Sequence, residues 1–184
     1  DRHVELFIVT HIDADHIDGA IRLLADEELG VGYGDIWFNE HRHLVEHRAE
    51  QTTTRGAMQG EYFGAIVETR GLPLNEAFDG RAVVVPPQGS LPSVTLKGGL
   101  RLVLLSPTPT KLDRLRRDWE KVLKEKDMTP GDRAEALDRL AKRGRRTRGG
   151  DRSTFGGDTS SANGSSIAVV AEYRGERWLL AGDA

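Results

Sequence analysis

One stretch near the beginning of the chain decides the fold prediction: Val4-Glu5-Leu6-Phe7-Ile8-Val9-Thr10-His11-Ile12-Asp13-Ala14-Asp15-His16-Ile17-Asp18-Gly19. Its first part, Val4–Val9, is apolar apart from one glutamate, which predicts a short buried strand. A polar cluster follows at 11–18, and apolar residues then recur at helical spacing over Ala20–Leu29, which predicts a helix. The polar cluster therefore lies between two regular elements, where a rigid scaffold can position functional groups.

The rest of the chain mixes strand-like and helix-like segments. Strands are predicted at 35–39, 81–85, 94–96, 100–105, 167–173 and 178–181, with Trp37, Phe38 and Trp178 as core residues. Helices are predicted at 44–71 (broken at Gly56 or Gly60), at 111–127 and at 130–143, the last with Thr129 as N-cap. Gly98-Gly99 predicts a tight hairpin turn, and 144–164 predicts a glycine-rich loop. This mixture indicates the α/β or α+β class.

Composition limits the classes of protein that the chain can belong to. The 184 residues suffice for one domain, and 38% hydrophobic residues with 21 glycines are typical of a globular protein. A net charge of −3 provides no overall attraction to nucleic acid or anionic lipid. No stretch approaches the ~20 apolar residues of a membrane helix, so we expect no membrane span. The sequence has no cysteine, which excludes disulfides and thiolate metal sites and fits a reducing, cytoplasmic compartment.

The polar cluster holds candidate metal ligands. His11, Asp13, Asp15 and His16 fall within one short run, and polar groups at the edge of a core are costly unless something binds them. Imidazole nitrogens and carboxylate oxygens suit Zn²⁺, Mn²⁺ or Fe²⁺. We expect His11, Asp13 and Asp15 to share one face of an extended segment, with His16 at the start of the helix. Alternatively, Asp13 or Asp15 only caps a helix, which leaves both histidines unexplained.

The pattern His11-x-Asp13-x-Asp15-His16, between Thr10 and Ile17-Asp18-Gly19, resembles the signature of the metallo-β-lactamase superfamily. The common pattern has histidine at the position of Asp13. Aspartate there resembles the subset that contains the hydrolase domain of ComEC-type DNA-uptake (competence) proteins. Three further segments resemble the same subset: Leu104-Leu105-Ser106-Pro107, Asn163-Gly164-Ser165-Ser166, and the strand that ends in Gly182-Asp183.

This resemblance implies an αββα sandwich, in which helices flank two mixed β-sheets and a metal site lies along one edge. We expect residues 1–184 to form a single partial domain, an incomplete fragment of that fold. A basic insert of helices and loop is expected at about 109–162, because 111–157 matches no part of the family pattern.

The resemblance also implies hydrolysis by a metal-bound hydroxide, with one or two divalent ions, Zn²⁺ or Mn²⁺ and Mg²⁺ as a further option. His11 and Asp13 would belong to the first metal, Asp15 and His16 to the second, and Asp183 would bridge the two. Asp15 would also act as the catalytic residue that orients the attacking water. The reaction favoured for this subset is phosphodiester hydrolysis, as in a nuclease, with nucleic acid as a candidate partner.

The chain departs from the family pattern at two ligands. The family supplies one more histidine from the middle of the fold and a last one beyond the Gly-Asp strand. Asn163 stands nearest the first of these positions, with Asp158 behind it, and either is a hard oxygen ligand or a turn former. With Asp13 in place of histidine, the first site should prefer Mn²⁺ or Mg²⁺ over Zn²⁺.

Other polar residues are weaker candidates. Asn39 ends a predicted strand and His41 follows it, so both could approach a metal or substrate, although a position in a solvated loop is commoner for such residues. The stretch 111–148 carries 14 Lys/Arg against eight Asp/Glu, and it either contacts phosphates or is a solvated helix face.

Two other interpretations of function stay open. The same fold could hydrolyse amide, lactam or thioester bonds, or it could be a catalytically degenerate binding module. The location would be extracytoplasmic if the chain belongs to a DNA-uptake protein.

Overall fold

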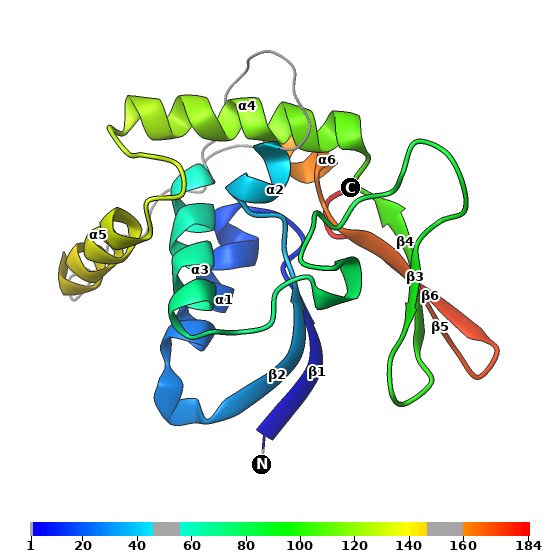
Figure 1. Ribbon diagram of the computed structural model, residues 1–184. Coiled ribbons are helices and arrows are strands. Elements are labelled where there is room, and N and C mark those ends of the chain that lie inside the picture. Colours follow the sequence, from blue (N-terminus) through cyan, green and yellow to red (C-terminus); the bar gives the residue numbers. More distant parts are fainter. Residues whose placement is uncertain (1, 46–55, 147–159) are drawn as a thin grey trace.

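The computed structural model describes residues 2–45, 56–146 and 160–184 (Figure 1). Its strands are β1 (Arg2–Ile8), β2 (Val31–Trp37), β3 (Ser93–Thr95), β4 (Arg101–Ser106), β5 (Ala168–Tyr173) and β6 (Glu176–Leu180). Its α-helices are α1 (Ala14–Ala25), α2 (His41–Val45), α3 (Ala57–Thr69), α4 (Pro109–Glu125), α5 (Arg133–Arg146) and α6 (Ser160–Gly164). Two 3₁₀ turns, η1 (Glu27–Leu29) and η2 (Glu76–Phe78), complete the regular structure of the described residues.

The strands form two sheets. β1 and β2 pair in parallel through the crossover helix α1, and the other four strands form an antiparallel sheet in the order β3-β4-β5-β6. The expected mixture of helices and strands in one chain is therefore confirmed as a mixed α/β arrangement with two sheets. Among the described residues, no helix is both long enough and apolar enough to cross a bilayer.

The β1–β2 pair forms the middle layer of the molecule. Phe7 and Ile36, paired in register, belong to the core shared with α1 and α3. Their neighbours Ile8 and Trp37 belong to a second core shared with Leu104 and other residues of the four-stranded sheet. This alternation follows from the two-residue period of a strand, which sends successive side chains to opposite faces.

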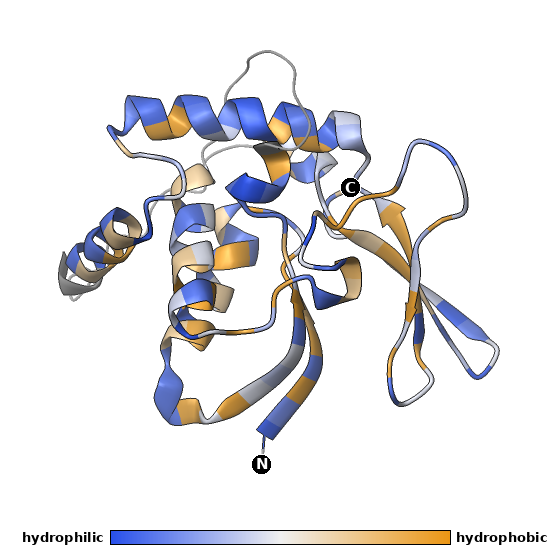
Figure 2. Cartoon of the chain, viewed as in Figure 1, coloured by the Kyte–Doolittle hydropathy of each residue, from blue (hydrophilic) through white to orange (hydrophobic). Residues whose placement is uncertain are grey.

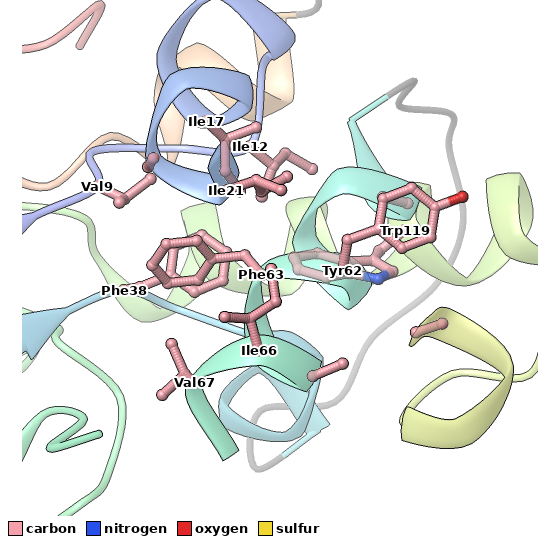
Figure 3. Packing of buried hydrophobic residues seen from close by; sticks show 14 of the residues in the cluster. Val9, Ile12, Ile17, Ile21, Phe38, Tyr62, Phe63, Ile66, Val67 and Trp119 are labelled. Carbon is pink, nitrogen blue, oxygen red and sulfur yellow. The ribbon is translucent and has the colours of Figure 1, made fainter. Parts of the chain in front are cut away.

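The main core is built around aromatic and branched side chains. Figure 3 shows Ile17 and Ile21 of α1 on one side, with Phe63 of α3 and Phe38 facing them. Phe38 and Phe63 meet edge to face, with ring centroids 4.7 Å apart, a preferred geometry for aromatic pairs.

Helix α4 belongs to this core, although its sequence lies in the predicted basic insert. Leu112, Leu115, Trp119, Val122 and Leu123 are buried along one face of the helix. Figure 2 shows the same division, with hydrophobic residues on the side toward the body of the molecule and hydrophilic residues on the other. Side chains from the expected insert therefore form part of the main core.

The hairpin predicted at Gly98-Gly99 is confirmed, because β3 and β4 are antiparallel around this pair. Gly-Gly is typical of turns with two positive φ values, but of the two glycines only Gly99 has one (85°). A second hairpin joins two further predicted strands. β5 and β6 meet at Arg174 (φ 49°) and Gly175 (φ 86°), where two positive φ values match the right-handed twist of the strands.

Four local predictions are wrong. The first helix begins at Ala14, well before the expected Ala20. Residues 81–85 form no strand, because the backbone N–H of Val83 donates to the side chain of Asn39 and that of Val85 to the carbonyl of Pro107. Helix α5 begins at Arg133 and is capped by Asp132, which accepts from the backbone of Glu135 at 2.9 Å, so Thr129 is not the N-cap.

The fourth error concerns Trp178, which is 48% exposed, whereas Trp37 and Phe38 are buried as expected. β6 is an edge strand of its sheet, and nothing in the described residues covers it. The residues 46–55 and 147–159, which include Asp158 and much of the expected glycine-rich loop, lie outside the described residues.

Candidate metal centre

Three segments meet at the carboxyl end of β1. The chain leaves β1 through Thr10 and His11 and turns into α1, which carries His16. The carbonyl of Thr10 accepts a hydrogen bond from the backbone of Ile167 at 2.9 Å, and this bond ties the start of β5 to the end of β1. Asp183 comes just after β6, the antiparallel neighbour of β5. The pairing of β5 with β6 thus brings the end of the described chain to the first polar cluster.

His11, His16 and Asp183 form a compact group, named here the His/Asp cluster. One ligand atom from each residue lies within 4.8 Å of the other two. His16 Nε2 is 3.4 Å from Asp183 Oδ2, and the two imidazole rings have centroids 4.1 Å apart. A glycine precedes Asp183 for a steric reason: Gly182 has a φ of 57°, and a Cβ there would lie 3.0 Å from Cβ of Thr10.

Two aspartates flank this cluster. Asp13 Oδ2 is 3.6 Å from His11 Nε2, and Asp15 Oδ2 is 3.8 Å from His16 Nε2. Asp13 occupies the N-cap position of α1, but its side chain makes no cap hydrogen bond. The alternative role of Asp13 as a helix cap therefore explains its position at the start of α1, but it does not explain why its carboxylate lies beside His11. Asp15 lies in the first helical turn, so the expected extended face shared by His11, Asp13 and Asp15 is wrong.

The donor set fits a divalent cation. His11 is buried at 2% exposure, and its Nε2 atom is buried without a hydrogen-bond partner among the described residues. Within residues 2–45, 56–146 and 160–184, no lysine or arginine forms an ion pair with Asp15 or Asp183. Imidazole nitrogen together with carboxylate oxygen suits Zn²⁺ and Mn²⁺. Of the described residues, His11, His16 and Asp183 are placed to hold such an ion.

Two candidate residues lie in other contacts. The amide of Asn39 donates to the carbonyl of Val83 at 2.9 Å and accepts from its N–H at 2.8 Å, so the side chain holds the 81–85 segment against β2. His41 Nε2 is 3.4 Å from Glu120 Oε1 of α4. Burial lowers the pKa of His41 below its usual range, although the Glu120 carboxylate opposes this. His41 does not belong to the His/Asp cluster.

Asn163 lies in α6 and is half-buried. Its carbonyl accepts a hydrogen bond from the backbone of Ser166 at 2.9 Å, which places it in the turn that leads into β5. The structure therefore places Asn163 in the turn expected for it.

Two hydroxyl residues at this centre were not among the predicted site residues. Thr10 Oγ1 lies 3.0 Å from His11 Nδ1 and 3.4 Å from His16 Nδ1, and Ser166 Oγ lies 3.2 Å from His11 Nδ1. Thr10 directly precedes His11, and Ser166 ends one of the segments that resemble the metallo-β-lactamase pattern. Their positions in these motifs could have identified Thr10 and Ser166 as site residues from the sequence.

Comparisons with protein-family models, with curated proteins and with solved structures gave no match.

Proposed function

We propose that this protein is a metal-dependent hydrolase of the metallo-β-lactamase type, with a phosphodiester as substrate. The observation that carries the proposal is the meeting of His11, His16 and Asp183, from segments far apart in the chain, in one group of metal-ligating atoms. Support for the αββα assignment comes from the order of the motifs along the chain and from two packed sheets with helices beyond the β1–β2 pair.

Each residue of the centre has a distinct role in this proposal. His11, His16 and Asp183 hold the cation, and Asp13 adds a hard oxygen donor beside His11. A divalent cation bound there supplies Lewis acidity, which polarises a phosphoryl oxygen and acidifies water. Asp15 has a side chain that is 52% exposed, so it can reach a solvent molecule and accept its proton.

A basic face on α4 supports a polyanionic substrate. Arg114, Lys121 and Lys124 are exposed and lie on one side of the helix, at intervals of seven and three residues. None of the three has an ion-pair partner among the described residues, whereas Arg117 nearby pairs with Asp113 at 2.6 Å. Unpaired cations in a row attract a chain of phosphates, and nucleic acid is therefore the substrate class that we favour.

The first test is hydrolysis by the full-length protein of bis(p-nitrophenyl) phosphate and of single-stranded DNA, with Mn²⁺, Mg²⁺ and Zn²⁺ in turn. We expect metal-dependent cleavage that falls at least about 100-fold in Asp183→Asn and in Asp15→Asn, because catalytic groups of this kind each contribute about 10²–10⁴-fold. Asp79→Asn makes the same change at an exposed aspartate and should leave the rate unchanged. Equal rates in all these proteins would rule the proposed centre out.

The substrate class has its own test. Arg114→Glu with Lys121→Glu should raise the KM for DNA and flatten its dependence on salt, by about 0.7 in the logarithmic slope for each phosphate that the protein no longer neutralises. Cleavage of the small phosphodiester should not change. Arg22→Glu with Lys97→Glu makes the same charge change at exposed positions of other elements and is the matched control. If both double variants behave alike, α4 does not bind the substrate.

A degenerate cation-binding module is the second candidate. It is favoured by the small number of donors, since the group of histidine and carboxylate ligands found among the described residues has three members. Stoichiometric cation binding without cleavage of any phosphodiester, amide or thioester would identify this function. Cleavage of an amide or thioester alone, with Zn²⁺, would keep the hydrolase and change the bond.

A further inference from the structure

Two hydroxyl groups link the histidines of the His/Asp cluster to the rest of the fold. Thr10 Oγ1 contacts the Nδ1 atoms of both histidines, at 3.0 Å and 3.4 Å. Ser166 Oγ contacts His11 Nδ1 at 3.2 Å and accepts from the backbone N–H of Asp183 at 3.4 Å. Ser166 is completely buried. These two side chains therefore touch all three members of the cluster.

These contacts bear on which nitrogen of each imidazole carries the proton. A hydroxyl oxygen has two lone pairs, so Thr10 Oγ1 can accept one N–H from each imidazole. A proton on Nδ1 leaves the Nε2 lone pair free on the same ring. Both Nε2 atoms lie on the side of the carboxylates, within 3.6 Å of Asp13 for His11 and 3.4 Å of Asp183 for His16. The hydroxyls thus hold the rings with their metal-binding nitrogens toward the acidic groups.

Both hydroxyls sit on well-anchored backbone. The carbonyl of Thr10 accepts from Ile167 N at 2.9 Å, and the N–H of Ser166 donates to the carbonyl of Asn163 at 2.9 Å. The Thr10 side chain also packs against Gly182, where an added Cβ would lie 3.0 Å from Cβ of Thr10. A hydroxyl on a rigid support orients a ligand more effectively than one on a mobile side chain.

We propose that Thr10 and Ser166 are positioning residues, which select the Nδ1–H tautomer of His11 and His16 and present both Nε2 atoms to a divalent cation. This inference rests on the proposed function for the presence of the cation. It adds the prediction that the affinity for the cation depends on two hydroxyl groups that do not themselves bind the ion. Loss of such supporting hydrogen bonds typically weakens metal affinity about 10–100-fold.

The experiment is calorimetric titration of the full-length, metal-free protein with Mn²⁺ and with Zn²⁺, which needs no enzymatic activity. Ser166→Ala should weaken binding about 10–100-fold. Ser165→Ala is the matched control, because Ser165 is also buried, at 2% exposure, and its hydroxyl donates to the carbonyl of Ala162 at 2.6 Å instead of contacting a histidine. Urea unfolding of each variant separates loss of affinity from loss of the folded state.

Thr10 offers a pair of substitutions that separates hydrogen bonding from packing. Thr10→Val keeps the shape and removes the hydroxyl, and it should weaken binding about 10–100-fold as Ser166→Ala does. Thr10→Ser keeps the hydroxyl and should restore the wild-type affinity. If Val and Ser variants bind equally well, or if Ser165→Ala weakens binding as much as Ser166→Ala, the positioning role is wrong. Wild-type protein that binds neither ion would instead overturn the proposed function, and this inference with it.

Discussion

Two polar clusters in this molecule balance their charges in different ways. In the first, named here the Arg133 network, Arg133 contacts Glu40 at 2.8 Å, Glu68 at 2.8 Å and Glu61 at 3.7 Å. Glu61 also accepts from the indole N–H of Trp119 and from the backbone of Gly131, each at 2.9 Å. The protein thus supplies its own cation and donors, and Glu40 and Glu61 can be buried at 1% exposure each.

The His/Asp cluster has carboxylates without such a cation. Asp183 and Asp15 face His16, with side chains 44% and 52% exposed, and neither pairs with a lysine or arginine of the described residues. A buried charge needs a partner, and these two carboxylates instead remain about half exposed to solvent. The Arg133 network therefore contains its own cation, whereas the carboxylates of the His/Asp cluster contact histidines and solvent; under the proposed function, a divalent cation from outside would balance their charge.

The largest expected effect comes from removing the internal cation. Arg133→Leu removes the cation that Glu40 and Glu61 share. Glu40 then pairs with Arg42, whose side chain is 58% exposed, and Glu61 keeps its two hydrogen bonds. Breaking a buried pair costs about 3–5 kcal/mol. Urea unfolding would measure this loss. Arg81→Leu breaks an exposed pair with Asp79 and should cost less than about 1 kcal/mol. Similar losses for the two variants would mean that the Arg133 network does not stabilise the fold.

The next effect is expected when a divalent cation is added. Mn²⁺ or Zn²⁺ at 100 times its Kd should raise the free energy of unfolding of the wild-type protein by about 2.7 kcal/mol. His16→Ala should abolish this increase, while Arg133→Leu, although less stable, should retain it. Thermal unfolding with and without the ion checks both expectations. An increase of the same size in His16→Ala would place the binding site elsewhere.

A smaller effect is expected from one donor of the Arg133 network. Trp119→Phe removes the indole N–H that Glu61 accepts and keeps the aromatic packing of the core. Burial already raises the pKa of Glu61 despite its hydrogen bonds, so the loss of a donor should raise this pKa further. We expect a cost of about 1–3 kcal/mol at neutral pH.

The cost of Trp119→Phe should shrink as the pH falls, because protonation removes the buried charge. For a carboxyl whose folded-state pKa is raised, the folded protein binds the extra proton, and stability falls as the pH rises from the unfolded value of about 4.3 through the raised value. Unfolding across this range measures the change. A cost independent of pH would indicate that only packing changed.

The smallest effect belongs to His41, which faces Glu120, Arg116 and Arg133 at the border of the Arg133 network. Because burial lowers the pKa of His41, the unfolded chain takes up a proton between that lowered value and about 6.5 while the folded protein does not. The free energy of unfolding should therefore fall as the pH drops through this window, by at most about 1.4 kcal/mol per pH unit. His41→Gln should remove this slope and the exposed control His3→Gln should not, as unfolding measured at pH 5–7 would show.

Much of the local structure follows from short patterns in the sequence. The run 4–9, apolar except at Glu5, predicts β1, because a strand that is buried on both faces needs apolar residues at nearly every position. The hairpins at Gly99 and Gly175 follow from the freedom of glycine to take a positive φ. Four of the five predicted metal-site residues, namely His11, Asp13, Asp15 and His16, lie within six consecutive residues. Their proximity therefore needs no long-range contact.

Long-range packing determines the remaining features. Asn39 was a reasonable candidate ligand from its place after a strand, but its amide holds the backbone of Val83. Trp178 has the pattern of a core residue, but its strand lies at a sheet edge and leaves it exposed. Such outcomes depend on which element covers a given face, and a local pattern of residues carries no information about its distant neighbours.

The centre itself combines both kinds of information. The short spacing of His11 and His16 follows from covalent geometry and is visible in the residues alone. Asp183 reaches His16, and Ser166 reaches His11 across 155 residues of chain, because β5 and β6 pair in register and the start of β5 is bonded to Thr10. The hydrogen bond between Ile167 and Thr10, which no short pattern of residues specifies, therefore brings this hairpin to the cluster that the first sixteen residues begin.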